Sequence, residues 1–463
     1  MNILQGVEDM EKLVKAIQNT NLRITVLGSG YVGLPTAALF ANAGFHVIAV
    51  DVKPEVVQTV NNGASPINEP GLHELISCNV QAGRLKATLD SAEALNQADT
   101  VIISVQTPID HNKKPNLSFL MKALEEVGKT MKEKTLTVIS STVPPGVMFG
   151  KVKPKLESLK DLKADIGFYL AYVPERIAPG KALKEFVESP RLIGGIGPNS
   201  TKIATELFRT VCKELIETDA ATAEVAKLAE NTFRDVNIAF ANQLALLCEQ
   251  LEVDATEVTK LANTHPRVNM HMPGPGVGGP CLPKDPYLLI HKTEPREQNI
   301  IKTARQVNNH MPKHIINRTI QALEKAGKKI RDSRIAILGT AYKANVDDSR
   351  VSPSETIVHE LIRLGSKVTV CDPHCNETFG AKKAKSLREA VKSADCLAII
   401  TDHTEFKNLN LQEIKALMNK KPLIIDGRRI VNPRKAKNLG FIYYGVGFRN
   451  SVAEKEAKNR ESR

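Results

Sequence analysis

Short apolar runs rich in β-branched residues alternate with longer amphipathic stretches through the first part of the chain. The runs lie at 23–27, 47–50, 100–105 and 137–140. A second series of the same kind follows at 334–338, 367–371, 396–401 and 423–426. Strand-sized runs that alternate with helical stretches are typical of a parallel sheet covered by helices on both faces. The pattern therefore predicts an α/β protein with two doubly wound parallel-sheet domains.

The region between the two series has a helical pattern. No Gly or Pro occurs from Asn199 to His265, and apolar residues recur at helical spacing from Val225 to Leu251. A helix of about 30 residues here would be roughly 45 Å long, enough to connect two domains. We therefore predict an N-terminal extension, a first α/β domain, a helical central domain, a second α/β domain and a basic, solvated tail, at 1–20, 21–211, 212–315, 316–450 and 451–463.

Composition and charge narrow the class of protein. The 463 residues are 42% apolar and 25% charged, a balance typical of soluble globular proteins. No apolar run approaches the roughly 20 residues of a membrane span, and the first twenty residues lack the pattern of a secretory signal. Seven scattered cysteines favour a reducing compartment, so we expect a cytoplasmic protein. The net charge of +12 is dispersed and Trp is absent, which favours anionic small ligands over nucleic acid or a membrane.

A glycine-rich turn follows the first predicted strand. It reads Gly-Ser-Gly-Tyr-Val-Gly at 28–33, and Asp51 ends the next strand. Such glycines let backbone N–H groups approach a pyrophosphate at a helix N-terminus, while the acidic residue accepts the ribose hydroxyls. The context predicts a Rossmann-like site for NAD rather than NADP, because Asp51 repels a 2′-phosphate. The candidate cofactor-binding residues of this turn are Gly28, Gly30, Tyr31, Val32, Gly33 and Asp51.

One cysteine lies in a loop that cannot be regular helix or strand. Residues 273–286 read Pro-Gly-Pro-Gly-Val-Gly-Gly-Pro-Cys-Leu-Pro-Lys-Asp-Pro, with the cysteine at 281. Lys284 would favour the thiolate, and Asp285 could activate water. We therefore interpret Cys281 as a nucleophile. The surroundings of Cys78, Cys212, Cys248 and Cys396 are apolar or helical, as for structural cysteines.

Two polar residues of the predicted central helix are further candidates. Lys227 and Asn231 are four residues apart and so share one helix face. If that face met the Cys281 loop, Lys227 would stabilise an oxyanion; otherwise it is a solvated lysine. The run from Cys371 to Cys375 contains Asp372 and His374 but lacks a second ligand pair, so we predict no metal site.

These residues together resemble the UDP-glucose/GDP-mannose dehydrogenase family from about Arg23 to Asn432. The matching motifs are Gly28–Gly33, Thr107-Pro108, Ser141–Gly146, Pro174-Glu175-Arg176, Lys227–Asn231, Gly278–Cys281, and Tyr342-Lys343 with Asp347–Pro353. The resemblance implies a cofactor domain, a helical dimerisation domain and a UDP-binding domain in that order. It also implies a four-electron oxidation of a sugar C6 alcohol to the carboxylate with two NAD⁺, through a thioester on the cysteine.

The resemblance assigns roles to residues by position. It makes Cys281 the nucleophile, Lys227 and Asn231 the oxyanion partners, and Asp285 the residue that orients or activates water. Thr107 and Glu175 would position reactants and solvent, with Thr107 and Thr142 also near the cofactor. Arg176, Lys343 and Arg428 are expected to bind the nucleotide sugar. Arg267 would reach the site of a partner subunit, which implies a homodimer or a higher homo-oligomer.

Residues outside the shared motifs indicate which sugar is oxidised. The runs 233–242 and 265–269 are similar to the family branch that oxidises UDP-N-acetyl-D-mannosamine, and Arg176 with Pro179 belongs to the N-acetylhexosamine branch. Pro280 and Lys284 depart from that branch, so UDP-N-acetylglucosamine and UDP-glucose remain alternatives. A catalytically silent nucleotide-binding regulator would have no need for the cysteine and its partners. A two-electron 3-hydroxyacid dehydrogenase would need neither Cys281 nor a second α/β domain.

Overall fold

The computed structural model describes residues 3–292 and 299–448, with the side chains described from Met10 onward. The chain forms two compact units. The first unit runs to Glu230 and includes a short return segment that begins at Tyr287. The second unit begins at Asn231 and contains the rest of the chain.

The first unit is built on an eight-stranded sheet in the order β3-β2-β1-β4-β5-β6-β7-β8. All neighbouring strands are parallel except β6 and β7, which are antiparallel. In register, Leu27 pairs with Val50 on one side and with Ile103 on the other, so these three strands end together. The strands are β1 Arg23–Leu27, β2 His46–Val50, β3 Leu85–Thr88, β4 Thr100–Ile103, β5 Leu136–Ile139, β6 Tyr169–Tyr172, β7 Arg191–Gly195 and β8 Leu215–Asp219.

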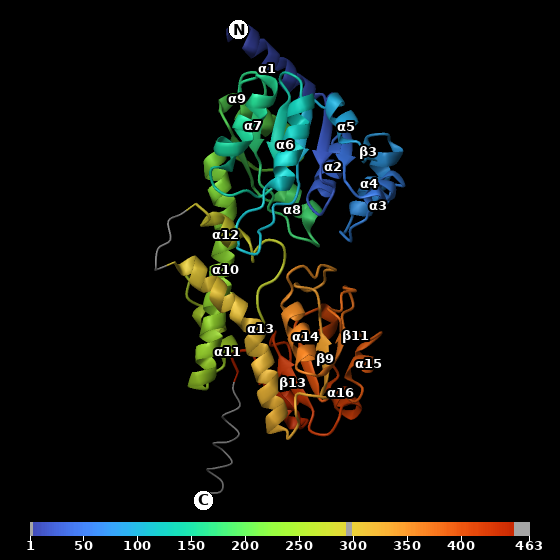
Figure 1. The fold of residues 1–463 in the computed structure, drawn as a ribbon, viewed down its shortest axis with the longest axis vertical. Helices are drawn as coiled ribbons and strands as arrows, with labels where there is room; N and C mark the ends of the chain where they lie inside the picture. Colours follow the sequence, from blue (N-terminus) through green and yellow to red (C-terminus); the bar gives the residue numbers. More distant parts are fainter. Residues whose placement is uncertain (1–2, 293–298, 449–463) are drawn as a thin grey trace, which may run out of the picture. The chain divides into compact units, whose positions relative to one another are not determined.

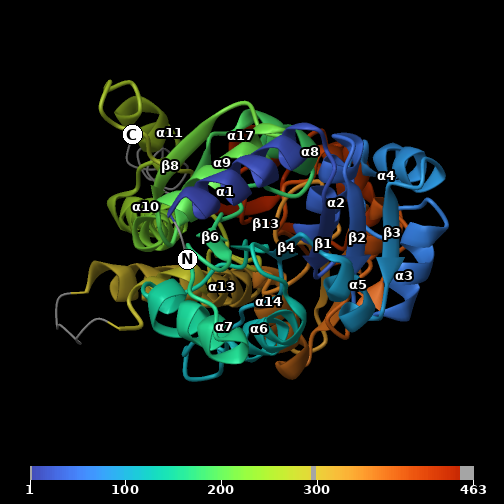
Figure 2. The ribbon, with the colours of Figure 1, turned by 90° about the horizontal axis from the view of Figure 1, so that it is seen from above.

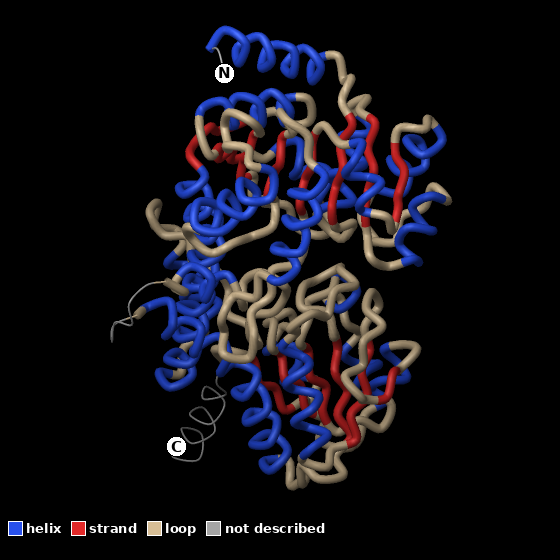
Figure 3. Tube along the Cα trace, turned by 45° about the horizontal axis from the view of Figure 1, so that its top comes forward, coloured by secondary structure: helices blue, strands red, loops and turns tan. Residues whose placement is uncertain are grey.

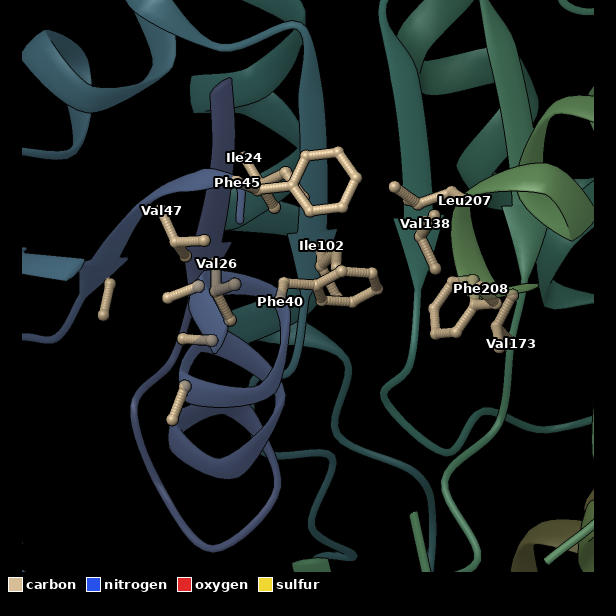
Figure 4. Close-up of a cluster of buried hydrophobic side chains, with 14 of the residues drawn as sticks. Ile24, Val26, Phe40, Phe45, Val47, Ile102, Val138, Val173, Leu207 and Phe208 are labelled. Carbon is tan, nitrogen blue, oxygen red and sulfur yellow. The ribbon is translucent and has the colours of Figure 1, made fainter. Parts of the chain in front are cut away.

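Helices cover both faces of this sheet because strand residues alternate between two apolar clusters. One cluster includes Val26, Val138 and Phe208, and Figure 4 shows Phe208 beside Val138. It is completed by α1 Ile3–Gln18, α2 Gly33–Asn42, α3 Pro54–Asn61, α4 Leu72–Gln81, α8 Ala182–Glu188 and α9 Pro198–Arg209. The other cluster is covered by α5 Ser91–Gln97, α6 Ser118–Thr130, the π-helix η1 Met148–Val152 and α7 Lys153–Lys160.

The N-terminal extension forms α1, which lies along α9 (Figure 2). Ile17 is buried there in the same cluster as Phe208, and Leu13 and Val14 pack against that cluster. The apolar side of this added helix therefore extends the core of the first unit.

The predicted long helix is α10, Ala220–Leu251, which has 32 residues and is the long green helix of Figure 1. Its first turn belongs to the core of the first unit, where Ala220 and Ala223 are buried. Its last turns belong to the second unit, where Ala245 and Cys248 are buried. The two units therefore share one continuous helix.

The second unit contains a six-stranded, fully parallel sheet in the order β11-β10-β9-β12-β13-β14, and Figure 3 shows its strands side by side. The strands are β9 Arg334–Leu338, β10 Lys367–Cys371, β11 Lys382–Lys383, β12 Cys396–Ile399, β13 Leu423–Asp426 and β14 Ile442–Gly445. One face packs against α10, α11 Ala255–Ala262, α13 Ile300–Lys325 and α14 Pro353–Arg363. The other packs against α15 Leu387–Val391, the 3₁₀-helix η2 Thr404–Phe406, α16 Leu411–Leu417 and α17 Pro433–Asn438.

The fold class predicted from the apolar pattern is confirmed, whereas the elements cross two of the predicted domain boundaries. Strand β8 begins after residue 211 and pairs with β7, so it completes the first sheet. Helix α13 runs through residue 315 because its apolar side is buried continuously from Met311 to Leu323. Among the described residues, no helix combines the length and apolar character needed to cross a membrane.

Candidate active site

The glycine-rich turn of the first unit leaves room for a ligand at one position and is tightly packed at the other two. Gly28 has φ +94°, and a Cβ there would lie 2.5 Å from the carbonyl oxygen of Ser104. A Cβ on Gly33 would lie 1.8 Å from the carbonyl oxygen of Gly28. A Cβ on Gly30 would meet no atom within 4 Å. The turn is therefore shaped so that a pyrophosphate can approach the backbone at Gly30, as NAD requires.

Asp51 lies beside this turn at the end of β2. Its carboxylate accepts hydrogen bonds from the backbone N–H of Ser29 at 3.0 Å and of Lys53 at 3.0 Å. Each oxygen accepts one such bond, and a carboxylate offers about four acceptor sites. Asp51 thus retains acceptor capacity for a ribose. Tyr31 and Val32, the other predicted cofactor residues of the turn, are half-buried where α2 begins.

The loops that follow β4 and β5 are joined by a second predicted pair. The hydroxyl of Thr107 donates to the backbone carbonyl of Thr142 at 2.6 Å, and Ser141 donates to the carbonyl of Val105 at 2.7 Å. These bonds fix the two loops at the carboxyl edge of the sheet, where open α/β sheets bind their ligands.

Glu175, just after β6, is buried in an ion pair. It accepts from Arg191 at 2.8 and 3.2 Å and from the backbone N–H of Arg176 at 2.7 Å. The Arg191 guanidinium lies 3.9 Å from the ring centre of Phe186. The Arg176 guanidinium pairs with Glu230 of α10 and donates to the carbonyl of Pro190 at 2.6 Å. The structure therefore gives both predicted residues protein partners.

Lys227 lies one turn before Glu230 on α10. Its side chain is buried, with 7% exposed, yet the structure gives its ammonium no hydrogen-bond or ion-pair partner among the residues it describes. Asn231 follows four residues later on the same helix face. A buried, unpaired ammonium is able to stabilise a developing oxyanion.

The Cys281 loop belongs to the second unit and packs on Tyr342. Gly279 has φ +92°, and a Cβ there would lie 2.7 Å from Cε2 of Tyr342. A Cβ on Gly278 would lie 2.6 Å from the carbonyl oxygen of Val351. The Gly279 N–H donates to the carbonyl of Arg350 at 3.0 Å. These contacts hold the loop against the segment after β9 and leave Cys281 exposed.

Tyr342 was named in the sequence only as part of a motif, yet it lies beside the thiol. Burial raises the pKa of Tyr342 to about 12, and the charges of Asp348 and of the Cys281 thiolate act in the same direction. The phenol is therefore neutral near pH 7. The signal that could have found it is the glycine pair at 278–279, since adjacent glycines in an irregular loop often mark a close approach.

Asp285 connects the loop to α10. Its carboxylate is fully buried and accepts from Nδ2 of Asn231 at 2.6 Å and from Nζ of Lys284 at 2.8 Å. The backbone N–H groups of Lys284 and Asp285 both donate to the carbonyl of Cys281, at 3.0 and 2.9 Å. The structure thus brings together Asn231, Cys281 and Asp285, and pairs the Lys284 ammonium with the carboxylate.

A buried relay of amides fixes the beginning of the same loop. The Gly274 N–H donates to Asn242 at 2.8 Å, and Asn242 donates to Asn308 at 2.9 Å. Asn308 and Arg305 both donate to Asp235, at 2.8 and 2.6 Å. These polar side chains of α10 and α13 are nearly inaccessible to solvent. Loss of one of their hydrogen bonds would therefore leave buried polar groups unpaired.

The remaining predicted substrate residues lie in the second unit. Arg428, which follows β13, donates from Nε to the carbonyl of Ile400 at 2.9 Å, and a Cβ on Gly274 would lie 3.1 Å from its Nη1. Lys343 is exposed beside Tyr342. Arg267 is exposed in the turn after α11. Arg428 therefore lies against the start of the Cys281 loop, and Lys343 follows Tyr342, on which that loop packs.

His374, His403 and Glu405 cluster closely enough to suggest a cation site. Nδ1 of His403, however, accepts the backbone N–H of Asn345 at 2.9 Å, which places the ring proton on Nε2. That nitrogen contacts Asp372 at 2.9 Å. Both ring nitrogens of His403 therefore have protein partners, and His374 pairs with Glu405 at 3.1 Å.

Three family models match consecutive parts of this chain. They describe the NAD binding, central and UDP binding domains of the UDP-glucose/GDP-mannose dehydrogenase family, at residues 22–212, 221–310 and 336–433. The chain belongs to this family. It is an NAD-dependent nucleotide-sugar dehydrogenase, as the resemblance of its motifs implies.

Individual relatives cover nearly the whole chain. A Pyrococcus horikoshii protein named UDP-N-acetyl-D-mannosamine dehydrogenase is 43% identical over 428 residues, which are 92% of this chain and 99% of the relative. The solved structure of UDP-D-ManNAc dehydrogenase from the same organism matches with a TM-score of 0.87 and 42% identity, over 92% of this chain and 99% of that one. NDP-N-acetyl-D-galactosaminuronic acid dehydrogenase from Methanosarcina mazei matches with a TM-score of 0.81 and 37% identity, over 95% and 98% of the two chains.

Proposed function

We propose that this dehydrogenase oxidises C6 of UDP-N-acetyl-D-mannosamine to the carboxylate through a thioester on Cys281. The observation that carries the chemistry is the exposed Cys281 thiol in a rigid loop whose next turn holds Asp285 against Asn231. The name of the Pyrococcus horikoshii relative supports the sugar. An N-acetylhexosamine also agrees with Arg176 and Pro179, which differ from the residues expected for a glucose enzyme.

The roles of the residues follow from their chemistry. Two NAD⁺ molecules, bound in turn, would each accept one of the two hydrides that C6 loses, and the turn at Gly30 with Asp51 would hold each of them. The Cys281 sulfur adds to the C6 aldehyde, and the Lys227 ammonium with the second amide proton of Asn231 would stabilise the oxyanion. Loss of the second hydride leaves a thioester. Asp285 would orient the water that releases the acid and regenerates the thiol.

The predicted roles of five further residues are retained in this proposal. Thr107, Thr142 and Glu175 would shape the loops around the reacting groups, while Lys343 and Arg428 would take the nucleotide diphosphate as cations. Arg176 was expected to bind the nucleotide sugar, and in the structure its guanidinium pairs with Glu230. We also propose that the enzyme acts in the cytoplasm, in keeping with seven cysteines that form no disulfide.

The decisive experiment counts NADH per sugar. Purified protein is incubated with excess NAD⁺ and a limiting amount of UDP-N-acetylmannosamine, UDP-N-acetylglucosamine or UDP-glucose. We expect two NADH per sugar, with kcat/KM highest for UDP-N-acetylmannosamine and lowest for UDP-glucose. A pocket that hydrogen-bonds an acetamido group is left with unpaired polar groups when that group is missing. One NADH per sugar would exclude the thioester route, and a fastest reaction with UDP-glucose would exclude the acetamido assignment.

We further propose that two copies of the chain pair through α10. Phe233, Phe240 and Leu247 of α10 are 66%, 58% and 43% exposed, although they are large apolar side chains. They are seven residues apart and therefore form one stripe along α10. An exposed apolar stripe of this length is typical of a protein interface. A second copy fits it because the same stripe supplies a self-complementary surface, and Arg267 would then reach the partner's site.

A further inference from the structure

Two carboxylates lie one helical turn from Lys227, on either side of it. Glu224 precedes Lys227 by three residues and Glu230 follows it by three. Residues three apart on a helix are neighbours, so either carboxylate is able to pair with the ammonium. A paired ammonium would be drawn away from an oxyanion and partly neutralised.

The preceding carboxylate is held by backbone groups. Glu224 is inaccessible to solvent and accepts the N–H of Gly146 at 2.6 Å and the N–H of Met148 at 2.7 Å. These residues lie at the start of η1, directly after the loop that carries Thr142. Each oxygen of Glu224 therefore has a backbone donor, and neither oxygen pairs with Lys227 in the structure.

The following carboxylate is held by Arg176. Nε of Arg176 donates to Oε1 of Glu230 at 2.8 Å, and Nη2 contacts the same oxygen. Nη1 donates to the carbonyl of Pro190 at 2.6 Å, which fixes the guanidinium in place. The backbone of Arg176 is fixed in turn by Glu175, which accepts its N–H at 2.7 Å. Glu230 is therefore paired with Arg176, whose guanidinium and backbone are both fixed by other hydrogen bonds.

We infer that Arg176 is a positioning residue that holds Glu230 away from Lys227 and so keeps the catalytic ammonium available. The inference rests on the proposed role of Lys227. It explains why a buried lysine between two acidic neighbours has no partner among the described residues. It also assigns Arg176 a function inside the protein, in place of direct contact with the sugar. Removal of Arg176 releases Glu230 to pair with Lys227 at the i, i+3 spacing.

The test compares Arg176→Gln, Glu230→Gln and the double variant with the wild-type enzyme, in the NADH assay with saturating NAD⁺. We expect Arg176→Gln to lower kcat at least about fivefold with little change in KM, because the ammonium acts on the transition state. Glu230→Gln should stay within about twofold of wild type, since a neutral amide competes weakly for Lys227. The double variant should recover most of the lost kcat, because the competing carboxylate is gone.

Recovery in the double variant separates this role from the alternatives. If Arg176 bound the sugar directly, its loss would raise KM and Glu230→Gln would not correct it. If the pair were only structural, both single variants would lose stability and the double variant would lose at least as much. Either pattern would overturn the inference. The exposed pair of Arg209 and Glu206 on α9, 2.5 Å apart, offers a matched control, and Arg209→Gln should change neither constant. An inactive wild-type enzyme would instead contradict the proposed function itself.

Discussion

Asp51 and Asp372 occupy equivalent positions in the two sheets but have different partners. Each follows the second strand of its sheet and accepts an N–H from the turn after the first strand, at Ser29 and Thr340 respectively. Asp372 also accepts from backbone N–H groups at Ala341, His374 and Cys375 and contacts His403. Burial opposes the charge of Asp372, but these hydrogen bonds outweigh it and lower the pKa of the carboxyl. Asp372 is therefore saturated, and only Asp51 retains capacity for a ribose.

We predict that Asp51→Ala weakens NAD⁺ binding about ten- to a hundredfold and reduces the preference over NADP⁺. Each hydrogen bond to a charged group is worth about 1.5–3 kcal/mol, and repulsion of the 2′-phosphate is lost with the carboxylate. Titration of the protein with each cofactor measures both effects. Asp372→Ala is the matched control and should leave NAD⁺ affinity unchanged while it lowers stability. Unaltered NAD⁺ affinity in Asp51→Ala would remove Asp51 from the site.

At Cys281 we predict that Cys281→Ser abolishes formation of the acid while NAD⁺ binding is retained. A hydroxyl is a much weaker nucleophile than a thiol near neutral pH, and its ester has a poorer leaving group. In Asp285→Asn the thioester should persist, and intact-mass spectrometry should detect sugar covalently bound to Cys281. Cys248, which is buried in α10, provides a control, since Cys248→Ser should retain turnover. Wild-type rates in Cys281→Ala would rule out covalent catalysis.

At the scale of elements, the Cys281 loop takes its shape from contacts with other segments. Gly276 packs on Pro312 and Pro353, and Gly278 packs on Val351, Tyr342 and Pro353. Because α13, α14 and the loop after β9 all take part, the thiol is positioned by the same unit that contains the predicted UDP-binding sheet.

We predict that Gly278→Ala destabilises the protein by about 1–3 kcal/mol and lowers kcat, because its Cβ would lie 2.6 Å from a backbone oxygen and 2.8 Å from Cβ of Tyr342. Thermal unfolding and the NADH assay measure the two effects. Gly150→Ala in η1 is the control, since a Cβ there meets no atom within 4 Å and alanine favours helix. Equal effects of the two substitutions would show that the close packing at Gly278 contributes neither to stability nor to kcat.

At the scale of the whole molecule, the strand order repeats. β11-β10-β9-β12-β13-β14 in the second sheet corresponds to β3-β2-β1-β4-β5-β6 in the first. The turn glycines Gly28 and Gly339 have similar φ values of +94° and +90° and make equivalent bonds to Val50 and Cys371. The same strand order thus forms both the NAD binding and the UDP binding domain. The long helix α10 connects the two units that contain these sheets.

We predict that Phe240→Glu shifts the protein from dimer toward monomer, because it places a charge in the proposed α10 interface. Analytical ultracentrifugation measures the change. Activity should fall with dissociation if Arg267 completes the partner's site. Phe119→Glu is a matched control, since Phe119 of α6 is 52% exposed and lies outside the stripe. A mass that stays the same in Phe240→Glu would place the interface elsewhere.

The sequence by itself determined the fold class and several of the elements, and it predicted Cys281 as the nucleophile. β1, β9, β10 and β13 begin and end at the predicted residues, because their apolar runs are bounded by turn residues. The glycine turn, Asp51 and the Cys281 loop were visible because each is a local pattern in the chain. Helix α10 was visible from the absence of Gly and Pro, although the same periodicity did not distinguish its buried side from its exposed stripe.

Only the tertiary structure decided which charges are paired. Lys227 and Lys284 look alike in the sequence, yet Lys284 pairs with Asp285 while both acidic neighbours of Lys227 are held by other groups. Arg176 and Glu230 are 54 residues apart, and Gly279 and Tyr342 meet from different elements. Such contacts depend on how distant segments pack, because a side chain's partner is set by distance in space. Periodicity along the chain records only which face of its own element a residue occupies.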